Sequence, residues 1–414
     1  MSDEKRVCLA YSGGLDTSVI LTWLRQEGYT VVAFLGNVGQ AEDWAAVEKK
    51  ALALGAERMV IEDLQQEFLE ELVFRGIQCD AIYEEQYLLG TSLARPVLAR
   101  ALVRAAKKYN CQTLSHGCTG KGNDQVRFEL AWRALYPSAS IIAPWRMPKF
   151  FNRFQGRQDL LQFAAENNIP VSSSPKSPWS QDDNLAHCSS ESGILEKPDM
   201  PAPKDVWIKS VDPLDAPDVP AKFSVTFKAG IPVKLEVEGG ETYTESVELF
   251  KALNKIAGEH AVGRTDIVES RFIGLKSRGC YDAPAHTVLR LAHVDIQGMT
   301  VDSKVRQIMK WIGNEWSQCL YNGMYFSPER ELLENSIIYS QKHVNGTVNM
   351  MVYKGGAHVL SRSAPDSNLY SEEQASMDTL EGFSPEDTSG FIAIQAIRLE
   401  KYGAGKVQQG EPLV

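Results

Sequence analysis

Residues 12–18 carry the clearest chemistry in the chain, a polar loop with two adjacent glycines. Gly13 and Gly14 let backbone N–H groups approach an anion without interference from a Cβ atom. The hydroxyls of Ser12, Thr17 and Ser18 suit phosphate oxygens. The loop lacks the Gly-Lys-Ser/Thr ending of a P-loop and the third glycine of a dinucleotide fingerprint. It therefore predicts a phosphate-binding loop that holds pyrophosphate in a different way.

Asp16 places a negative charge inside this loop, where it would repel a polyphosphate. Two roles resolve the conflict, because the carboxylate can act through a magnesium ion or can cap the following helix. Asp16 is therefore a candidate catalytic residue, and Mg²⁺ is expected to be bound together with the phosphates. The alternative is an ordinary strand-to-helix turn in which the polar residues only cap the helix.

A second glycine-rich loop covers residues 115–129, where three glycines alternate with polar and charged side chains. Such a loop suits a zwitterionic amino acid, because Thr119 and Asn123 can face its carboxylate while Asp124 faces its ammonium group. Arg127, one turn into the next helix, offers a two-pronged donor to a second carboxylate. We interpret the loop as a binding site rather than a plain surface turn.

Two side chains are candidates for assisting the chemistry, and a third is better interpreted as structural. Asp124 is a candidate acceptor for a proton from an ammonium group. Arg95 is a candidate for steadying phosphate charge, although an arginine before a proline is also common on plain surfaces. His116 follows directly on a predicted strand, and we interpret it as structural rather than catalytic. The seven cysteines are scattered and never spaced Cys-x-x-Cys, so no protein-bound metal is expected.

The elements around the two loops alternate between strands and helices over the first 170 residues. Strands are predicted at residues 6–10, 29–35, 58–61, 113–115 and 141–143, and helices at 19–28, 42–54, 92–109 and 124–135. This alternation predicts an α/β fold with a parallel sheet covered by helices on both faces. Both loops then lie at the carboxyl ends of strands, where such sheets bind ligands.

The rest of the chain predicts a second, α+β domain and a terminal helix. Residues 197–220 hold six of the nineteen prolines and indicate a linker or a wrapped loop. Hairpins are predicted at 223–237 and 347–362, and helices at 246–258, 302–321 and 329–343. The predicted domains are a nucleotide-binding domain at 1–170, the α+β domain at 171–365, and a tether with an oligomerisation helix at 366–414.

The predicted terminal helix, residues 388–402, carries an apolar face. Phe391, Ile394 and Ile397 share that face at helical spacing. The helix either docks onto its own domain or reaches a neighbouring subunit. We favour the arm that reaches a neighbour, because the polar tether before it is long.

Composition excludes several classes of protein. The 414 residues are 43% hydrophobic and 23% charged, which is typical of an ordered, soluble protein. No apolar run is long enough to cross a membrane, and the N-terminus does not have the pattern of a signal peptide. The net charge of −10 argues against a nucleic-acid partner. Scattered, unpaired cysteines favour a reduced compartment, so we expect a cytoplasmic enzyme.

The loop at residues 12–18 resembles that of the N-type ATP pyrophosphatases, which cut ATP between the α and β phosphates. The second loop, with residues 87–96, resembles the argininosuccinate synthetase family specifically. The resemblance covers nearly the whole chain, including residues 10–18, 37–40, 143–146, 176–189, 262–281 and 326–328. It implies a homotetramer, assembled in part by its last helix, that acts in arginine biosynthesis and the urea cycle. It also implies ligation of citrulline to aspartate through a citrullyl-adenylate, with release of AMP and pyrophosphate.

Carried over residue by residue, the resemblance implies three sets of contacts. The ATP contacts are Ala10, Tyr11, Ser12, Gly13, Gly14, Leu15, Asp16, Thr17, Ser18, Gly36 and Gly117. The aspartate contacts are Thr119, Asn123 and Asp124. The citrulline contacts are Tyr87, Ser92, Asn123, Arg127, Ser180, Ser189, Glu269 and Tyr281. Gly36 and Cys118 stand where alanine is usual, and because both are small we expect adjusted packing around the nucleotide rather than lost activity. Asp183 stands where glutamate is common, and its side chain is one methylene shorter.

Two alternatives remain open. Another ATP pyrophosphatase, such as a tRNA thiolase, would need a reactive cysteine pair and a basic RNA-binding face, and the sequence indicates neither. An asparagine synthetase would need a cysteine near residue 2, where Ser2 stands. A non-catalytic ATP-binding protein is the second alternative, and the loop at 115–127 and the large second domain weigh against it.

Overall fold

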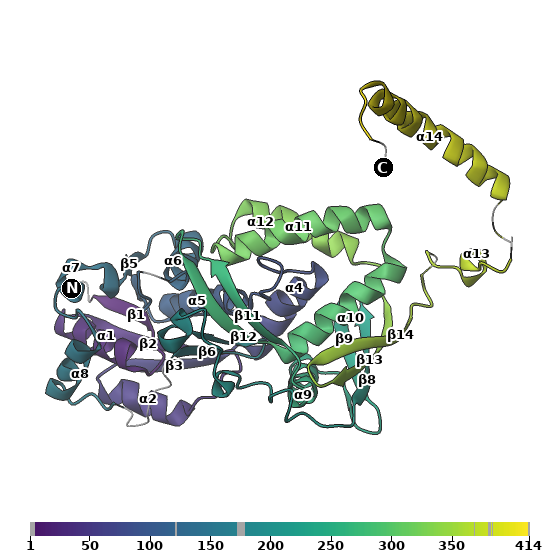
Figure 1. Ribbon diagram of the computed structural model, residues 1–414. Coiled ribbons are helices and arrows are strands. Elements are labelled where there is room, and N and C mark those ends of the chain that lie inside the picture. The colour runs from purple at the N-terminus through teal and green to yellow at the C-terminus, as the bar shows by residue number, and fades with distance from the viewer. Residues whose placement is uncertain are drawn as a thin grey trace. The chain divides into compact units, whose positions relative to one another are not determined.

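The computed structural model describes residues 5–120, 122–171, 179–367, 369–379, 382 and 384–412. The chain divides into two compact units, Met1–Asp366 and Ser367–Val414. Lys121 and the first part of the 176–189 motif, through Pro178, lie outside the described residues. The fold is mixed α/β with a parallel sheet, as predicted (Figure 1).

A five-stranded parallel sheet forms the N-terminal part of the larger unit. In spatial order its strands are β3 (Arg58–Asp63), β2 (Thr30–Asn37), β1 (Arg6–Ala10), β4 (Thr113–Ser115) and β5 (Ser140–Ile142). Strand order reverses between β1 and β4, which pair in parallel with Leu9 opposite Ser115. Ligands of doubly wound sheets bind at such a switch point, beyond the carboxyl ends of the strands. Both predicted loops begin there, because one follows β1 and the other follows β4.

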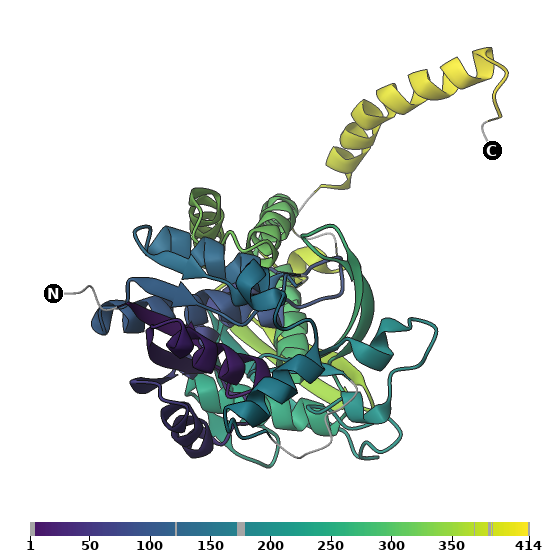
Figure 2. The ribbon, with the colours of Figure 1, turned by 90° about the vertical axis from the view of Figure 1, so that its left-hand side faces the viewer.

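Helices cover both faces of this sheet, because alternate side chains of each strand point to opposite sides. Val7 and Leu9 of β1 pack in one cluster with α1, α2 and α8, whereas Cys8 packs in the other cluster with α5 and α6. These helices are α1 (Leu15–Gln26), α2 (Trp44–Ala53), α5 (Gly90–Lys108), α6 (Asp124–Leu135), α7 (Pro148–Phe151) and α8 (Arg157–Glu166). Figure 2 turns this end of the unit towards the viewer.

Two antiparallel sheets complete the larger unit. The first contains β10 (Thr242–Tyr243), β9 (Ile231–Val237), β8 (Ala221–Lys228), β13 (Gly346–Tyr353) and β14 (Gly356–Ser363). The second contains β11 (Arg264–Ser270), β12 (Lys276–Asp282), β7 (Cys188–Glu191) and β6 (Ser180–Asp183). The pairing of β8 with β9 and of β13 with β14 confirms both predicted hairpins. The second sheet was not predicted from the sequence.

Further helices pack in this part of the unit, and two of them match predicted ones closely. They are α9 (Ser246–Glu259), α10 (Pro284–Thr300), α11 (Ser303–Tyr321) and α12 (Pro328–Ser340). Earlier in the chain lie α3 (Gln65–Glu67), a π-helical turn (Phe68–Val73) and α4 (Phe74–Gln78). Short 3-10 turns are formed by Pro144–Arg146, Gly193–Glu196 and Lys204–Val206. Neither α10 nor the helical residues 65–78 were predicted.

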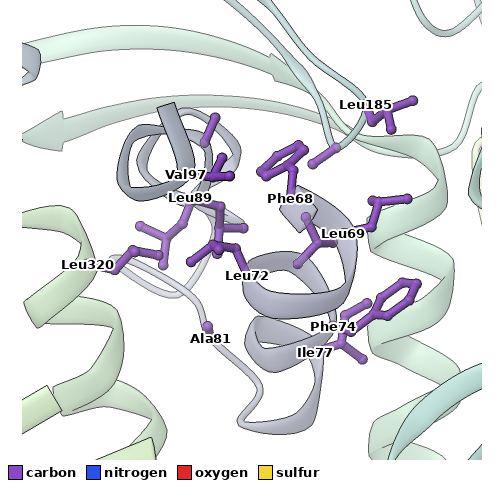
Figure 3. Close-up of a cluster of buried hydrophobic side chains, with 14 of the residues drawn as sticks. Phe68, Leu69, Leu72, Phe74, Ile77, Ala81, Leu89, Val97, Leu185 and Leu320 are labelled. Carbon is purple, nitrogen blue, oxygen red and sulfur yellow. The ribbon is translucent and has the colours of Figure 1, made fainter. Parts of the chain in front are cut away.

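One hydrophobic core runs from the parallel sheet into the rest of the larger unit. In Figure 3, Leu320 of α11 lies beside Leu72 and Leu89. Burying a leucine side chain contributes about 1.5–3 kcal/mol. This packing fixes the last turn of α11 against the start of α5. The division of this unit into domains at 1–170 and 171–365 stays a prediction.

The smaller unit contains α13 (Glu372–Ala375) and α14 (Pro385–Gln408). The terminal helix predicted at 388–402 lies within α14, whose first turn is capped by Ser384. Phe391, Ile394 and Ile397 are 65%, 69% and 53% exposed. Across the described residues of both units, no helix combines the length and the apolar character needed to cross a bilayer.

Candidate functional site

The loop at residues 12–18 connects β1 to α1, as predicted. Gly13 has a φ of +74°, a conformation that favours glycine. Gly14 is the N-cap of α1 and supplies no side chain to the first amides of the helix. Ser12 Oγ lies 3.2 Å from Thr17 Oγ1, which ties the two ends of the loop together. The loop therefore leaves a helix N-terminus open beside two hydroxyls, an arrangement that binds anions.

Gly117, after β4, lies against this first loop. A Cβ atom added at Gly117 would stand 3.0 Å from Cγ2 of Thr17 and 3.4 Å from Cδ1 of Ile20. The backbone of the second loop therefore runs directly over the first turns of α1. The two loops meet at one edge of the sheet, as their positions in the sequence predict.

Gly36, near the end of β2, is explained by packing. A Cβ atom there would stand 2.5 Å from Leu98 Cδ2 and 2.7 Å from Leu64 Cδ1. Both atoms are the ends of flexible side chains, which fill the space that a methyl group would occupy. This agrees with the expectation of adjusted packing at this position.

A cavity of about 250 Å³ opens beside the second loop. Its walls come from α5 and the segment before it, the start of α6, the β11-β12-β7-β6 sheet and the last turn of α11. The predicted residues that line it are Tyr87, Arg95, Thr119, Asn123, Asp124, Arg127, Ser180, Ser189, Glu269 and Tyr281. The predicted ATP contacts do not line this cavity, and they lie at the neighbouring strand ends.

Ser92 is the predicted amino-acid contact that the structure does not bring to this cavity. Its side chain is fully buried in α5, next to Arg95 and Arg127 but on a separate small void. Its hydroxyl has no hydrogen-bond partner among the described residues. A direct contact between Ser92 and citrulline stays a prediction, and its placement in the structure does not support it.

Two arginines hold Asp124. Arg95 Nη2 donates to Asp124 Oδ2 at 2.7 Å, and Arg127 Nη1 donates to Asp124 Oδ1 at 3.0 Å. Burial raises the pKa of Asp124, but the two positive charges outweigh this effect and hold the pKa well below its ordinary value. Asp124 is therefore a poor proton acceptor, which removes support for its predicted role as a base. A permanently charged carboxylate suits an ammonium group.

Arg95 is shared between two carboxylates. Its Nη2 also donates to Asp182 Oδ2 at 2.5 Å. With Asp124 and Asp182 both bonded to it, the charge of Arg95 is already compensated. The predicted role of Arg95 in steadying phosphate is therefore not supported, and its geometry instead positions Asp124.

Arg127 is fixed by Tyr321, a residue that sequence reasoning missed. Arg127 Nε donates to the backbone oxygen of Tyr321 at 3.0 Å, and the guanidinium lies 5.0 Å from the centre of the Tyr321 ring. That ring stacks on Tyr83 with centroids 3.7 Å apart. Among the described residues, Arg127 Nη2 makes no hydrogen bond, so it keeps donors for a substrate carboxylate.

The second antiparallel sheet carries the predicted citrulline contacts of the C-terminal half. Tyr281 pairs with Ser189 across β12 and β7, and its hydroxyl donates to Glu269 Oε1 at 2.8 Å. Glu269 is 4% exposed, and its Oε2 has no partner among the described residues. Burial raises the pKa of Glu269 to about 7, although the Tyr281 hydroxyl favours the charged form. A buried carboxylate oxygen without a partner calls for an N–H donor, such as a ureido group.

The other polar groups around the cavity are held in defined orientations. Asn123 Oδ1 accepts from the Phe272 amide at 3.1 Å, which leaves the Asn123 side-chain N–H groups as donors. His116 is fully buried and pairs with Glu129 at 2.9 Å, in keeping with a structural role. Asp183 pairs with Lys209 at 2.7 Å. No group of three or more His, Cys, Asp or Glu residues that could hold a metal occurs within the described part of the chain.

Several residues of the cavity wall were not among the predicted contacts. They are Thr91, Gln181, Asp182, Glu191, Ser192, Arg271 and Tyr321. Most are polar types that are common on ordinary surfaces, and Tyr321 reads as one more position of an amphipathic helix. Thr91, Gln181, Asp182 and Arg271 lie inside segments of the family resemblance, but only the fold places these side chains in the cavity wall.

Two family models match the chain. Arginosuccinate synthase N-terminal HUP domain matches residues 6–170, and Arginosuccinate synthase C-terminal domain matches residues 179–402. The chain is 52% identical to argininosuccinate synthase of Saccharomyces cerevisiae, over 99% of each chain. It is 50% identical to that of Gallus gallus, over 96% of this chain and 95% of the relative. It is also 50% identical to that of Homo sapiens, over 97% and 98%.

Among solved structures, the chain is similar to a tRNA methyltransferase subunit from Methanocaldococcus jannaschii. The TM-score is 0.27 and the identity 18%, over 39% of this chain and 76% of the other. A likeness this weak carries no argument.

Proposed function

We propose a particular ligation for this chain, which belongs to the argininosuccinate synthase family and is therefore an ATP-dependent ligase. The ligation joins the ureido carbon of citrulline to the amino group of aspartate and serves arginine biosynthesis. The observation that carries the proposal is the position of the charged cavity. Asp124 and Arg127 stand at the start of α6, directly after the loop whose Gly117 touches Thr17 of the phosphate loop.

In the first step the ureido oxygen attacks the α-phosphorus of ATP, and pyrophosphate leaves as a citrullyl-adenylate forms. The open N-terminus of α1 and the hydroxyls of Ser12 and Thr17 support residues 12–18 as the holder of the departing pyrophosphate. On the other side, the unpartnered Oε2 of Glu269 supports binding of the ureido N–H groups. Its negative charge also stabilises the positive charge that develops as the ureido oxygen attacks.

In the second step the amine of aspartate attacks the activated carbon, and AMP leaves. Asp124 holds the ammonium group before it reacts, while the side-chain N–H groups of Asn123 and the Thr119 hydroxyl hold carboxylate oxygens. A ureido oxygen is a weak nucleophile, so positioning supplies much of the rate, up to about 7–11 kcal/mol. Burial raises the pKa of the Cys118 thiol in the cavity wall, which leaves it protonated and supports a route without a covalent enzyme intermediate.

Magnesium arrives with ATP rather than residing in the protein. Asp16 lies in the first turn of α1, is partly exposed, and makes no hydrogen bond or ion pair among the described residues. A carboxylate oxygen without a partner at a phosphate loop fits a Mg²⁺ ligand. When bound, the ion neutralises charge on the phosphates. Asp16 would hold the ion beside the phosphates that residues 12–18 bind.

The assembly and location of the enzyme follow from the family resemblance and from the surface of the chain. We infer a cytoplasmic homotetramer without nucleic-acid or membrane partners. The exposed apolar side chains of α14, among them Phe391 and Ile394, support an assembly role for this helix. The seven cysteines are free, which supports a reduced compartment.

One reaction tests the proposal. The purified chain is incubated with ATP, Mg²⁺, aspartate and citrulline labelled with ¹⁸O in the ureido group, and the products are analysed by mass spectrometry. We expect argininosuccinate, pyrophosphate and AMP that carries one ¹⁸O atom, because the ureido oxygen leaves on the phosphate. Argininosuccinate with unlabelled AMP would contradict the adenylate, and the absence of argininosuccinate would contradict the choice of substrates.

A further inference from the structure

The phosphate loop contains no basic residue of its own, although pyrophosphate carries several negative charges. Helix α2 supplies a basic residue from outside the loop, because Lys50 Nζ donates to the carbonyl oxygen of Gly13 at 2.7 Å. Helix α2 also packs on the same glycine through Val47, whose Cγ2 lies 3.1 Å from the position of an added Cβ. Val47 and Lys50 are three residues apart and share one helix face. That face of α2 is therefore shaped to meet the loop.

The charge of Lys50 is not compensated by an acidic side chain in the described part of the chain. Its ammonium group is partly buried, and burial lowers the pKa of Lys50. A partly desolvated cation next to an anion-binding loop attracts an anion more strongly than one in open water does. This placement costs free energy unless an anion binds beside it.

Lys50 also fixes the direction of a peptide group. Gly13 and Gly14 are joined by a trans peptide bond, in which the C=O and the N–H point in opposite directions. The Gly13 oxygen accepts from Lys50 Nζ and from Ser18 Oγ, the latter at 3.4 Å. The N–H of Gly14 therefore points away from these two donors. A cation on the carbonyl side also polarises the peptide and strengthens its N–H as a donor.

We propose that Lys50 is a positioning residue of the pyrophosphate site, which orients the Gly13–Gly14 peptide so that the Gly14 N–H faces the anion. The inference rests on the proposed function, since it deepens the role given there to residues 12–18. Lys50 acts through the loop backbone, and its charge adds to the field of the α1 N-terminus.

The test compares two lysines of the same helix. Lys50→Met removes the ammonium group from the loop, and Lys49→Met removes the same charge from an exposed position of α2. Binding of inorganic pyrophosphate with Mg²⁺ is measured by titration calorimetry. We expect Lys50→Met to weaken pyrophosphate binding by about 10- to 100-fold, the range of a hydrogen bond to a charged group. Lys49→Met should change it by less than about twofold. Lys50→Arg should recover part of the loss.

Two further readouts separate positioning from a loss of folding. Citrulline binding and the thermal unfolding midpoint of Lys50→Met should match those of Lys49→Met, and Lys50→Gln replaces the methionine variant if the latter does not fold. Equal pyrophosphate affinity in the two variants would overturn the inference, as would a parallel loss of citrulline binding. The proposed ligation alone would be contradicted if the wild-type chain makes no argininosuccinate while Lys50→Met still weakens pyrophosphate binding.

Discussion

The proposed phosphate loop and the proposed amino-acid cavity of this protein are built by different means. Residues 12–18 offer backbone amides and short hydroxyls from seven consecutive positions. The cavity offers charged and aromatic side chains from distant segments, such as Arg127 and Tyr321, which are 194 residues apart. The proposed phosphate site is therefore local and depends on backbone geometry, whereas the proposed amino-acid site depends on tertiary packing. The two regions should therefore respond differently to substitution.

The largest effect is expected in the phosphate loop. Asp16→Ala removes the carboxylate proposed to hold Mg²⁺ against the phosphates, and we expect ATP–pyrophosphate exchange to fall by about 10²–10³-fold. Exchange of labelled pyrophosphate into ATP, with citrulline present, measures this step. Citrulline binding measured without ATP should be unchanged, because Asp16 does not line the cavity. Near-normal exchange would exclude a metal or phosphate role for Asp16.

The second-largest effect is expected in the amino-acid cavity, where a substitution should affect citrulline far more than ATP. Arg127→Lys keeps the charge but loses the separate Nε and Nη donors that reach Tyr321 and Asp124. We expect citrulline KM to rise by about 100-fold and ATP KM by less than about threefold. Arg133→Lys, on the exposed face of the same helix, is the matched control. Equal losses for citrulline and ATP would break the separation between the two regions.

A smaller effect concerns the pH dependence of citrulline recognition. The pKa of Glu269 is raised to about 7, so kcat/KM for citrulline should fall by about tenfold per pH unit below 7. Glu269→Gln should remove this slope. The effect of pH on stability has the opposite sign, because the folded state binds the Glu269 proton more tightly than the unfolded chain does. The contribution of Glu269 to the free energy of unfolding should decline as pH rises through about 7. A flat citrulline profile in the wild type would contradict the assignment.

The smallest effect on the chemistry is expected from the C-terminal unit. Removal of residues 385–414 takes away α14 and its exposed apolar face, and light scattering should show a smaller assembly. Substrate affinities should change by less than about twofold, because the cavity wall lies within residues 1–366. An unaltered assembly would mean that the helix packs within its own subunit.

The sequence predicts the nucleotide half of the fold well because its strands and helices follow simple apolar patterns. Helix α6 begins and ends where predicted, at Asp124 and Leu135, and the chain order alone places both loops at one sheet edge. Strands β6 and β7 escape prediction because they are polar, and residues of both line the cavity. Helix α10 was not predicted, although its buried residues, among them Val288, Leu289, Ala292 and Ile296, follow helical spacing.

The candidate site was only partly predictable for a related reason. Residue types and the family resemblance identify most of the cavity wall, but a side chain's role depends on neighbours that the sequence does not place. Asp124 was expected to accept a proton, and Arg95 and Arg127 prevent this. Arg95 was expected to meet phosphate, and Asp182 helps to neutralise it instead.

The bond between Arg127 and Tyr321 has a consequence for how the protein is made. A chain grows at about 5–20 residues per second, so the 194 residues between them take roughly 10 to 40 s to add. Early in that interval the phosphate loop and, once β5 (Ser140–Ile142) has been added, all five strands of the parallel sheet have been synthesised, while the arginine still lacks the carbonyl that orients it. A nascent chain should therefore gain affinity for nucleotide before it gains any for citrulline.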